Sequence, residues 1–222
     1  MQLYLKVLEQ ILIHTESKTN NSDFRETLAD MKLHKGIYVC CVETYYFIMN
    51  LDLVKFEDMM EEAEVEPLHM WRVLYTFMRF DPSMPSPMKK HFLDLEICLL
   101  SYYSWLDDYT VESFMNNIDQ DKENEVSPMI KTGGSRGSIF MPAFKFFYRV
   151  LRQAATQMYH LASGLRLSED VIEEIWSLVK YVFTEKINLL IGRHLDNIIF
   201  CSIYVICKIS KLNIKFKEII NK

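Results

Sequence analysis

Three residues in the last part of the chain have side chains that suit the binding of a peptide. Cys201, Tyr204 and Lys208 follow one another at spacings of three and four. In a helix each residue turns about 100 degrees around the axis, so these three side chains would share one narrow stripe. A tyrosine ring packs against apolar ligand atoms while its hydroxyl bonds peptide backbone, and a lysine ammonium attracts an acidic ligand. A half-exposed helix face without a ligand would give the same pattern.

The other side of the same helix predicts a hydrophobic core. Leu195, Ile199, Ile203 and Ile206 lie between roughly 120 and 200 degrees from Cys201. An aliphatic face opposite a mixed face is typical of a helix that packs on one side only.

Patterns that would indicate catalysis or metal binding are missing. The six histidines (14, 34, 69, 91, 160 and 194) show neither a His-Glu-x-x-His nor a Cys-His spacing. The glycines at 133, 134 and 137 superficially suggest a phosphate loop, but no Gly-Lys-Ser/Thr ending follows and no strand precedes them. The acidic run at 61–64 could bind cations, although a solvated helix face explains it as well. We expect no enzymatic activity, no cofactor and no metal.

Composition and charge exclude several classes of partner. The net charge is −5 and no basic arm occurs, so direct binding to nucleic acid is not expected. The longest apolar region, 195–209, contains Asp196, Asn197 and Lys208, and it is too short and too polar for a membrane span. The five cysteines are odd in number and lack paired spacing, which indicates a reducing compartment, nuclear or cytosolic. The N-terminus lacks the features of a signal peptide.

Helical periodicity dominates both halves of the chain. It predicts helices over 4–12, 68–80 and 88–106, and over 37–49, which is apolar nearly all round and is expected to be a buried central helix. Three prolines at 82, 85 and 87 predict a break. Polar residues at 119–138 predict a linker or exposed loop. Further helices are predicted over 144–165, from a cap at Ser168 to about 190, and over 193–211. The expected class is all-α, in two helical blocks.

The second block resembles the B half of retinoblastoma-family pocket proteins. The most specific part is residues 193–208, RHLDNIIFCSIYVICK, and the match continues at 214–220, IKFKEII. Upstream, the similar motifs are FYR at 147–149, YHLA at 159–162, LSE at 167–169 and EIW at 174–176. The first block resembles the A half over 4–12, 68–79 and 88–106, including Ser104-Trp105-Leu106.

The resemblance implies a domain organisation and a set of partners. Residues 1–118 would form a partial A-like bundle and 139–222 a partial B-like bundle, both cyclin-like, joined by a flexible linker at 119–138. Transactivation segments of E2-factor/DP transcription factors would bind at the seam between the halves. Peptides containing Leu-x-Cys-x-Glu, from chromatin regulators, would bind the B half, and cyclin-dependent kinases would act as modifiers. The implied role is a nuclear transcriptional co-repressor that regulates the cell cycle.

The resemblance also implies particular site residues. The peptide-groove positions fall on Cys201, Tyr204 and Lys208, which are the residues that the helical stripe isolates independently. The seam positions fall on Arg79, Lys90, Glu96, Arg149 and Arg152. One acidic position of the family is Tyr75 here.

Two departures from the family pattern create further expectations. The family has A-half helices before residues 4–12 and B-half helices beyond Lys222, and the latter supply a Tyr-Asn pair of the groove. The chain is thus either a fragment or a shortened pocket protein. Without a further cover, Leu195, Ile199, Ile203 and Ile206 are expected to be partly exposed. The alternative functions are a cyclin-like scaffold that regulates a kinase or a basal transcription complex, and a truncated pocket protein with impaired binding.

Overall fold

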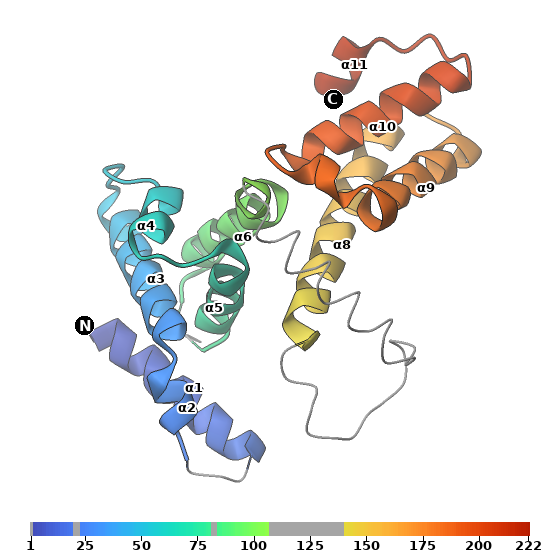
Figure 1. The fold of residues 1–222 in the computed structure, drawn as a ribbon. Coiled ribbons are helices and arrows are strands. Elements are labelled where there is room, and N and C mark those ends of the chain that lie inside the picture. Colours follow the sequence, from blue (N-terminus) through green and yellow to red (C-terminus); the bar gives the residue numbers. More distant parts are fainter. Residues whose placement is uncertain (1, 20–22, 81–83, 107–139) are drawn as a thin grey trace, which may run out of the picture. The chain divides into compact units, whose positions relative to one another are not determined.

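A computed structural model describes residues 2–19, 23–80, 84–106 and 140–222. Within these ranges the chain forms helices and loops without a strand (Figure 1), so the predicted all-α class is confirmed. None of the described helices combines the length and the apolar character that crossing a bilayer requires. In chain order the helices are α1 (Gln2–Thr19), α2 (Arg25–Ala29), α3 (Met31–Met49), α4 (Phe56–Glu62), α5 (Pro67–Phe80), α6 (Ser86–Ser101), η1 (Tyr103–Trp105), α8 (Phe140–Gly164), α9 (Glu169–Glu185), η2 (Ile187–Leu190), α10 (Leu195–Ile209) and α11 (Phe216–Ile220).

The chain divides into two compact units. The first unit is Met1–Leu99 and the second unit is Leu100–Lys222. The predicted linker at 119–138 and the predicted domain ends at 118 and 139 lie outside the described residues, so these boundaries remain predictions.

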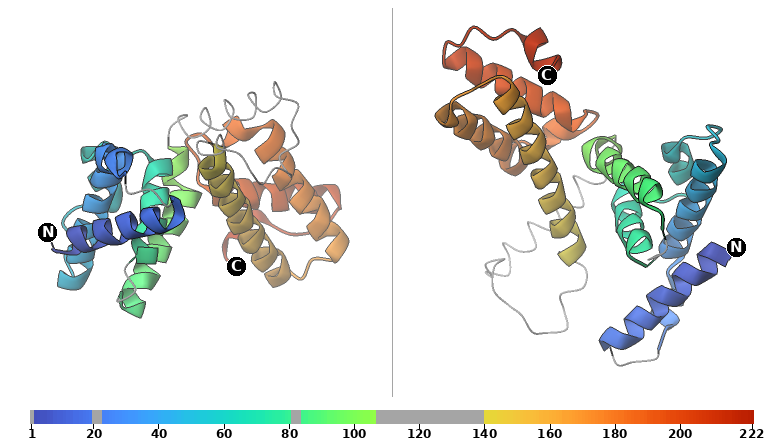
Figure 2. Two further views of the ribbon diagram at one scale, coloured as in Figure 1. Left: turned by 90° about the horizontal axis from the view of Figure 1, so that it is seen from below. Right: turned by 180° about the vertical axis from the view of Figure 1, so that it is seen from behind.

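The first unit is built around the packing of α3 against α5, and α1 runs across both helices (Figures 1 and 2). On α5 the buried residues Trp71, Leu74 and Phe77 recur every third position, which aligns them on one face. A Cβ atom at Gly36 of α3 would lie 2.8 Å from Cγ2 of Val73. Glycine at this position therefore permits the close approach of α3 to α5.

The prediction that residues 37–49 form a helix buried all round is wrong on one side. Ile37 and Cys40 of α3 are fully buried, but Tyr38, Tyr45 and Ile48 are 62%, 54% and 66% exposed. The reason is that α1, α4 and α5 cover only part of the circumference of α3 within the first unit. An apolar composition shows that a helix avoids water without showing which neighbours cover it.

The proline-rich segment separates α5 from α6, as predicted. Its last proline, Pro87, lies in the first turn of α6, where the missing amide hydrogen would have no helical partner in any case. The helix predicted at 88–106 is α6. It begins earlier than predicted, at Ser86, and ends at Ser101, where the short η1 follows it. Phe92 of α6 is fully buried, and its ring lies 5.4 Å from that of Phe77.

The second unit packs α10 against α8 and α9, with α11 folded back onto α10 (Figure 1). Its core includes Trp105, whose fully buried ring lies 6.0 Å from Phe147 and 6.4 Å from Phe183. The indole Nε1 donates a hydrogen bond to the carbonyl of Leu100 at 2.7 Å. The amide of Gly192 donates to the carbonyl of Trp105 at 2.6 Å. Trp105, which resembles an A-half residue in sequence, thus packs as part of the second unit.

Two helix starts in the second unit differ from the prediction in detail. Ser168 stands at the N-cap of α9, but its hydroxyl makes no capping hydrogen bond, and the first-turn residues Glu169 and Asp170 supply the negative charge that favours a helix start. At the start of α10, Nδ1 of His194 accepts a hydrogen bond from the amide of Asp196 at 3.1 Å. A histidine therefore caps the helix that carries the candidate site.

Candidate functional site

The inner side of α10 is more completely covered than the sequence suggests. Leu195, Ile199 and Ile203 are fully buried, so the expectation that they remain partly exposed is wrong. Only Ile206 is half-buried. The cover comes from α8, α9 and the short α11, whose Ile219 is also fully buried. Burying each large aliphatic side chain contributes about 1.5–3 kcal/mol, which fixes α10 as a rigid support.

The outer side of α10 presents the three predicted groove residues together. Cys201 and Lys208 are exposed, and Tyr204 between them is half-buried. The ammonium of Lys208 lies 5.2 Å from the centre of the Tyr204 ring. Such a cation–π contact at an exposed site contributes about 0.5–1 kcal/mol and leaves the ammonium available to a ligand.

Phe216 is a neighbour of the candidate site that helical periodicity missed. Its ring stands perpendicular to that of Tyr204, with 5.4 Å between the centres, and it is 38% exposed. Tyr204 is therefore in contact with both Phe216 and Lys208. The signal was present, because Phe216 lies in the motif at 214–220, but the turn between α10 and α11 hides its position from helical periodicity.

Apolar side chains extend this face beyond the predicted residues. Val205 and Ile209 of α10 are 43% and 68% exposed, next to the stripe of Cys201 and Lys208 on the helical wheel. Aliphatic residues at these positions look like core in the sequence alone. They widen the exposed side of α10 on the flank of Cys201 that lies away from Tyr204.

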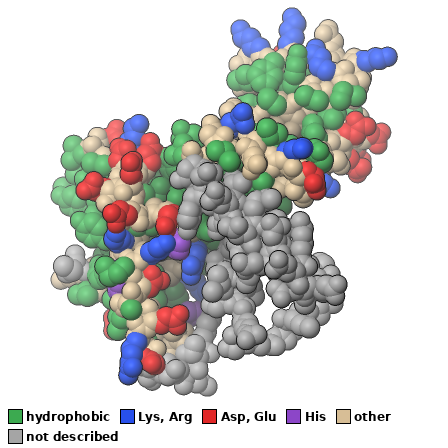
Figure 3. Space-filling view, viewed as in Figure 1, with side chains coloured by type: hydrophobic (Ala, Val, Ile, Leu, Met, Phe, Trp, Pro, Cys, Tyr) green, Lys and Arg blue, Asp and Glu red, His purple; other side chains and the backbone are tan. Residues whose placement is uncertain are grey.

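The charge around this surface is positive. The last 18 residues contain five lysines (208, 211, 215, 217 and 222) and one acidic residue, Glu218. Lysine and arginine side chains gather at the end of the second unit that carries α11 (Figure 3). A positive rim around an apolar face favours a ligand that is both apolar and acidic.

Cys207 of α10 is fully buried and does not belong to the exposed face. Burial raises the pKa of the Cys207 thiol, against a smaller opposing effect of Lys208. A raised pKa keeps Cys207 protonated at neutral pH, and the thiol is then a poor nucleophile. All five cysteines are free of disulfide bonds.

The predicted seam residues of the first unit occupy different environments. Arg79, in the last turn of α5, and Lys90, on α6, are exposed. Glu96 is only 3% exposed, and its carboxylate accepts a hydrogen bond from Nε1 of Trp71 at 3.0 Å. Glu96 therefore fixes α6 to α5 inside the first unit. Tyr75, which stands where the family has an acidic residue, is 53% exposed and lies one helical turn before Arg79.

The predicted seam residues of the second unit lie on α8. Arg149 is half-buried and Arg152 is exposed. Their spacing of three places them on neighbouring positions of one helix face. That the two sets of residues make one binding site remains a prediction.

Two family models together match most of the chain. Residues 1–117 match the A domain of the retinoblastoma-associated protein, and residues 143–222 match its B domain. The chain belongs to the retinoblastoma family of pocket proteins. The resemblance seen in the sequence is thereby confirmed.

Relatives of this pocket protein occur in plants and in a social amoeba. The chain is 21% identical to retinoblastoma-related protein 3 of Zea mays, over 99% of this chain and 30% of the relative. It is 23% identical to retinoblastoma-like protein A of Dictyostelium discoideum, over 100% of this chain and 19% of the relative. A stretch of 75 residues is 41% identical to retinoblastoma-related protein 1 of Oryza sativa subsp. indica, and it covers 34% of this chain and 7% of the relative. The chain thus spans a third or less of the length of these relatives.

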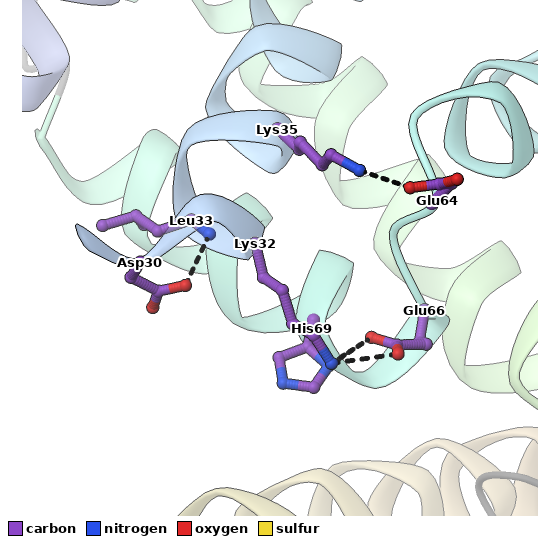
Figure 4. Close-up of polar contacts among 7 residues, drawn as sticks. All are labelled: Asp30, Lys32, Leu33, Lys35, Glu64, Glu66 and His69. Atoms are coloured by element: carbon purple, nitrogen blue, oxygen red, sulfur yellow. Dashed lines mark hydrogen bonds and ion pairs between the residues drawn. The ribbon is translucent and has the colours of Figure 1, made fainter. Parts of the chain in front are cut away.

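The acidic run of this pocket protein at 61–64 lies beside an ionic network in the first unit (Figure 4). Lys35 pairs with Glu64 at 2.6 Å, and the ammonium of Lys32 lies 3.0 Å from both carboxylate oxygens of Glu66. Nδ1 of His69 lies 2.8 Å from the same carboxylate. The network joins α3 to the connection between α4 and α5. Among the described residues no group of His, Cys, Asp and Glu could hold a metal ion.

Proposed function

We propose that this pocket protein is a non-enzymatic transcriptional co-repressor that acts in the nucleus to regulate the cell cycle. It binds Leu-x-Cys-x-Glu segments of chromatin regulators on the outer face of α10. It also binds the transactivation segment of E2-factor/DP transcription factors through residues of both units. Cyclin-dependent kinases are the proposed modifiers of these interactions. Membership of the retinoblastoma family supports this reading of the whole molecule.

The arrangement around Tyr204 is the observation that carries the proposal. Its ring is oriented by Phe216 and Lys208, and α10 is supported by fully buried residues behind it. An oriented aromatic side chain loses little conformational freedom when a ligand binds, which favours affinity. The lysines around it favour an acidic peptide over a neutral or basic one.

The proposal for the transactivation segment depends on exposed basic residues. Arg79, Lys90 and Arg152 are exposed, so an acidic segment could contact them without displacing a core side chain. We propose that Glu96 does not contact the segment itself. Its buried carboxylate accepts a hydrogen bond from Trp71 and so positions α6.

Charge reversal at Lys90 tests this part of the proposal. A Lys90→Glu variant should bind an E2-factor transactivation peptide roughly tenfold more weakly and associate more slowly, because it replaces attraction by repulsion. Arg149→Glu should act in the same direction. Calorimetry and stopped-flow fluorescence measure both quantities.

Neighbouring lysines provide matched controls. Lys89 is exposed beside Lys90 on α6, and Lys145 lies one turn before Arg149 on α8. Lys89→Glu and Lys145→Glu should leave the affinity within about twofold of the wild type. Equal losses in control and test variants would mean that only the net charge matters, and the seam assignment would then be abandoned.

A further inference from the structure

A hollow on the first unit lies apart from every site residue discussed above. α1, α3 and α4 enclose a groove of about 900 Å³. Its lining is mainly apolar and aromatic, and it includes Tyr38, Val42, Tyr45 and Met59. A volume of this size falls in the range of ligand-binding sites, and the lining residues have no function in the interactions proposed so far.

The apolar lining continues along α3 beyond the groove. Ile48 and Met49 are 66% and 54% exposed on the same helix as Tyr38 and Tyr45. From residue 38 to residue 49 a helix rises about 16 Å, which is roughly three turns. Leu53, in the connection to α4, is 71% exposed and extends the apolar surface. A surface of this length exceeds what a small molecule needs and matches a short helical segment.

The charges at the groove are negative and unpaired. Asp58 and Glu62 line it from α4, four residues apart and therefore on one face. Neither carboxylate has an ion-pair partner among the described residues, whereas the lining residue Lys35 is neutralised by Glu64. In Figure 3 acidic side chains gather at the end of the first unit that carries α4, next to hydrophobic ones.

The first unit is acidic as a whole. Residues 1–99 contain sixteen Asp and Glu and ten Lys and Arg, whereas residues 100–222 contain fourteen and fifteen. The negative charge of the protein is therefore concentrated on the unit that carries the groove. A negative field at the groove favours basic partners there.

We propose that this groove binds a short amphipathic helix of a partner protein, apolar on one face and flanked by Lys or Arg residues one turn apart. The apolar face would lie along α3, against Tyr38, Tyr45 and Ile48. The basic residues would pair with Asp58 and Glu62. This ligand is opposite in charge to the acidic peptide proposed for α10, so one chain would join a basic partner to an acidic one.

A peptide library tests the proposal with the full 222-residue chain. Helix-biased twelve-residue peptides displayed on phage are selected on the wild-type protein. Apolar residues should be enriched at spacings of three and four, together with Lys or Arg. No enrichment of basic amphipathic peptides above background would overturn the proposal, whereas acidic peptides selected through the proposed face on α10 do not bear on the groove.

Variants of the groove establish where the selected peptides bind. The double change Asp58→Lys with Glu62→Lys should weaken the best peptide roughly tenfold or more in fluorescence anisotropy, and added salt should weaken binding to the wild type. The matched control is Glu61→Lys with Asp94→Lys, two exposed carboxylates that do not line the groove. If both pairs have the same effect, the groove is not the site.

The apolar part of the site has its own matched pair. Tyr45→Ala, in the groove, should lower the affinity, and Tyr75→Ala, equally exposed on α5, should not. Circular dichroism verifies that each variant remains folded. Sedimentation velocity tests whether a second copy of the chain occupies the groove instead of a partner helix. A wild-type dimer that Tyr45→Ala converts to a monomer would show that a second copy fills the groove, and the proposal would be rejected.

Discussion

At the scale of single residues, the second unit depends on an indole near its first residue. Trp105 is fully buried among Phe146, Phe147 and Phe183, and its only polar atom is satisfied by the carbonyl of Leu100. Buried aromatic clusters contribute both apolar burial and favourable ring contacts, and the indole N–H seldom remains without a partner. Residues that match the A domain in sequence thus stabilise the unit that carries α10.

Truncating this indole should destabilise the second unit. Trp105→Ala removes a large buried side chain and leaves a cavity, at a cost of about 3–5 kcal/mol in the free energy of unfolding. Urea denaturation followed by circular dichroism measures the loss. Trp176→Ala is the matched control, because that indole is only half-buried on α9 and should cost less. Equal costs at the two positions would refute the structural role given to Trp105.

Between elements, the first unit uses charges to hold α3 against the connection between α4 and α5. Partial burial raises the pKa of Glu66, but the hydrogen bond and charge of Lys32 and the charge of His69 together outweigh it and lower that pKa. Burial and the charge of Lys32 lower the pKa of His69. A carboxylate with a lowered pKa and a histidine that prefers to be neutral both stabilise the fold above their unfolded pKa values, about 4.3 and 6.5.

Acid should therefore weaken this connection. As the pH falls from 7 to 4, protons bind His69 and then Glu66 more readily in the unfolded chain, so the first unit loses stability. Glu66→Gln should cost at most about 1 kcal/mol at pH 7, since the pair is partly exposed to solvent, and less at pH 4. Hydrogen exchange in α3 and α5, measured at both pH values, reports the effect. Glu61→Gln serves as the control, and a cost for Glu66→Gln that is independent of pH would contradict the account.

Helical periodicity predicts which residues share a face, and it does so correctly for α10. Cys201, Tyr204 and Lys208 lie outward and Leu195, Ile199 and Ile203 inward because a repeat of 3.6 residues follows from backbone geometry alone. Periodicity cannot predict what covers a face. Phe216 reaches Tyr204 across a turn, and the buried carboxylate of Glu96 accepts a hydrogen bond from Trp71, 25 residues earlier. These contacts depend on tertiary packing that no local pattern encodes.

At the scale of the whole molecule, the two units present surfaces of opposite character. The second unit carries an apolar face with a basic rim on α10 and α11, and the first carries an apolar groove with an acidic rim on α3 and α4. This organisation suits the adaptor function proposed above, in which rigid helical supports present separate surfaces to different partners.

Binding of a Leu-x-Cys-x-Glu peptide to the 222-residue chain tests the central claim most directly. Calorimetry should detect binding to the wild type, and Tyr204→Ala and Lys208→Glu should each weaken it roughly tenfold or more, because both residues belong to the proposed face. Tyr181→Ala and Lys180→Glu, on the exposed side of α9, should leave the Kd unchanged. A wild-type chain that does not bind, or losses as large in the α9 variants as in the α10 variants, would contradict the assignment of this face.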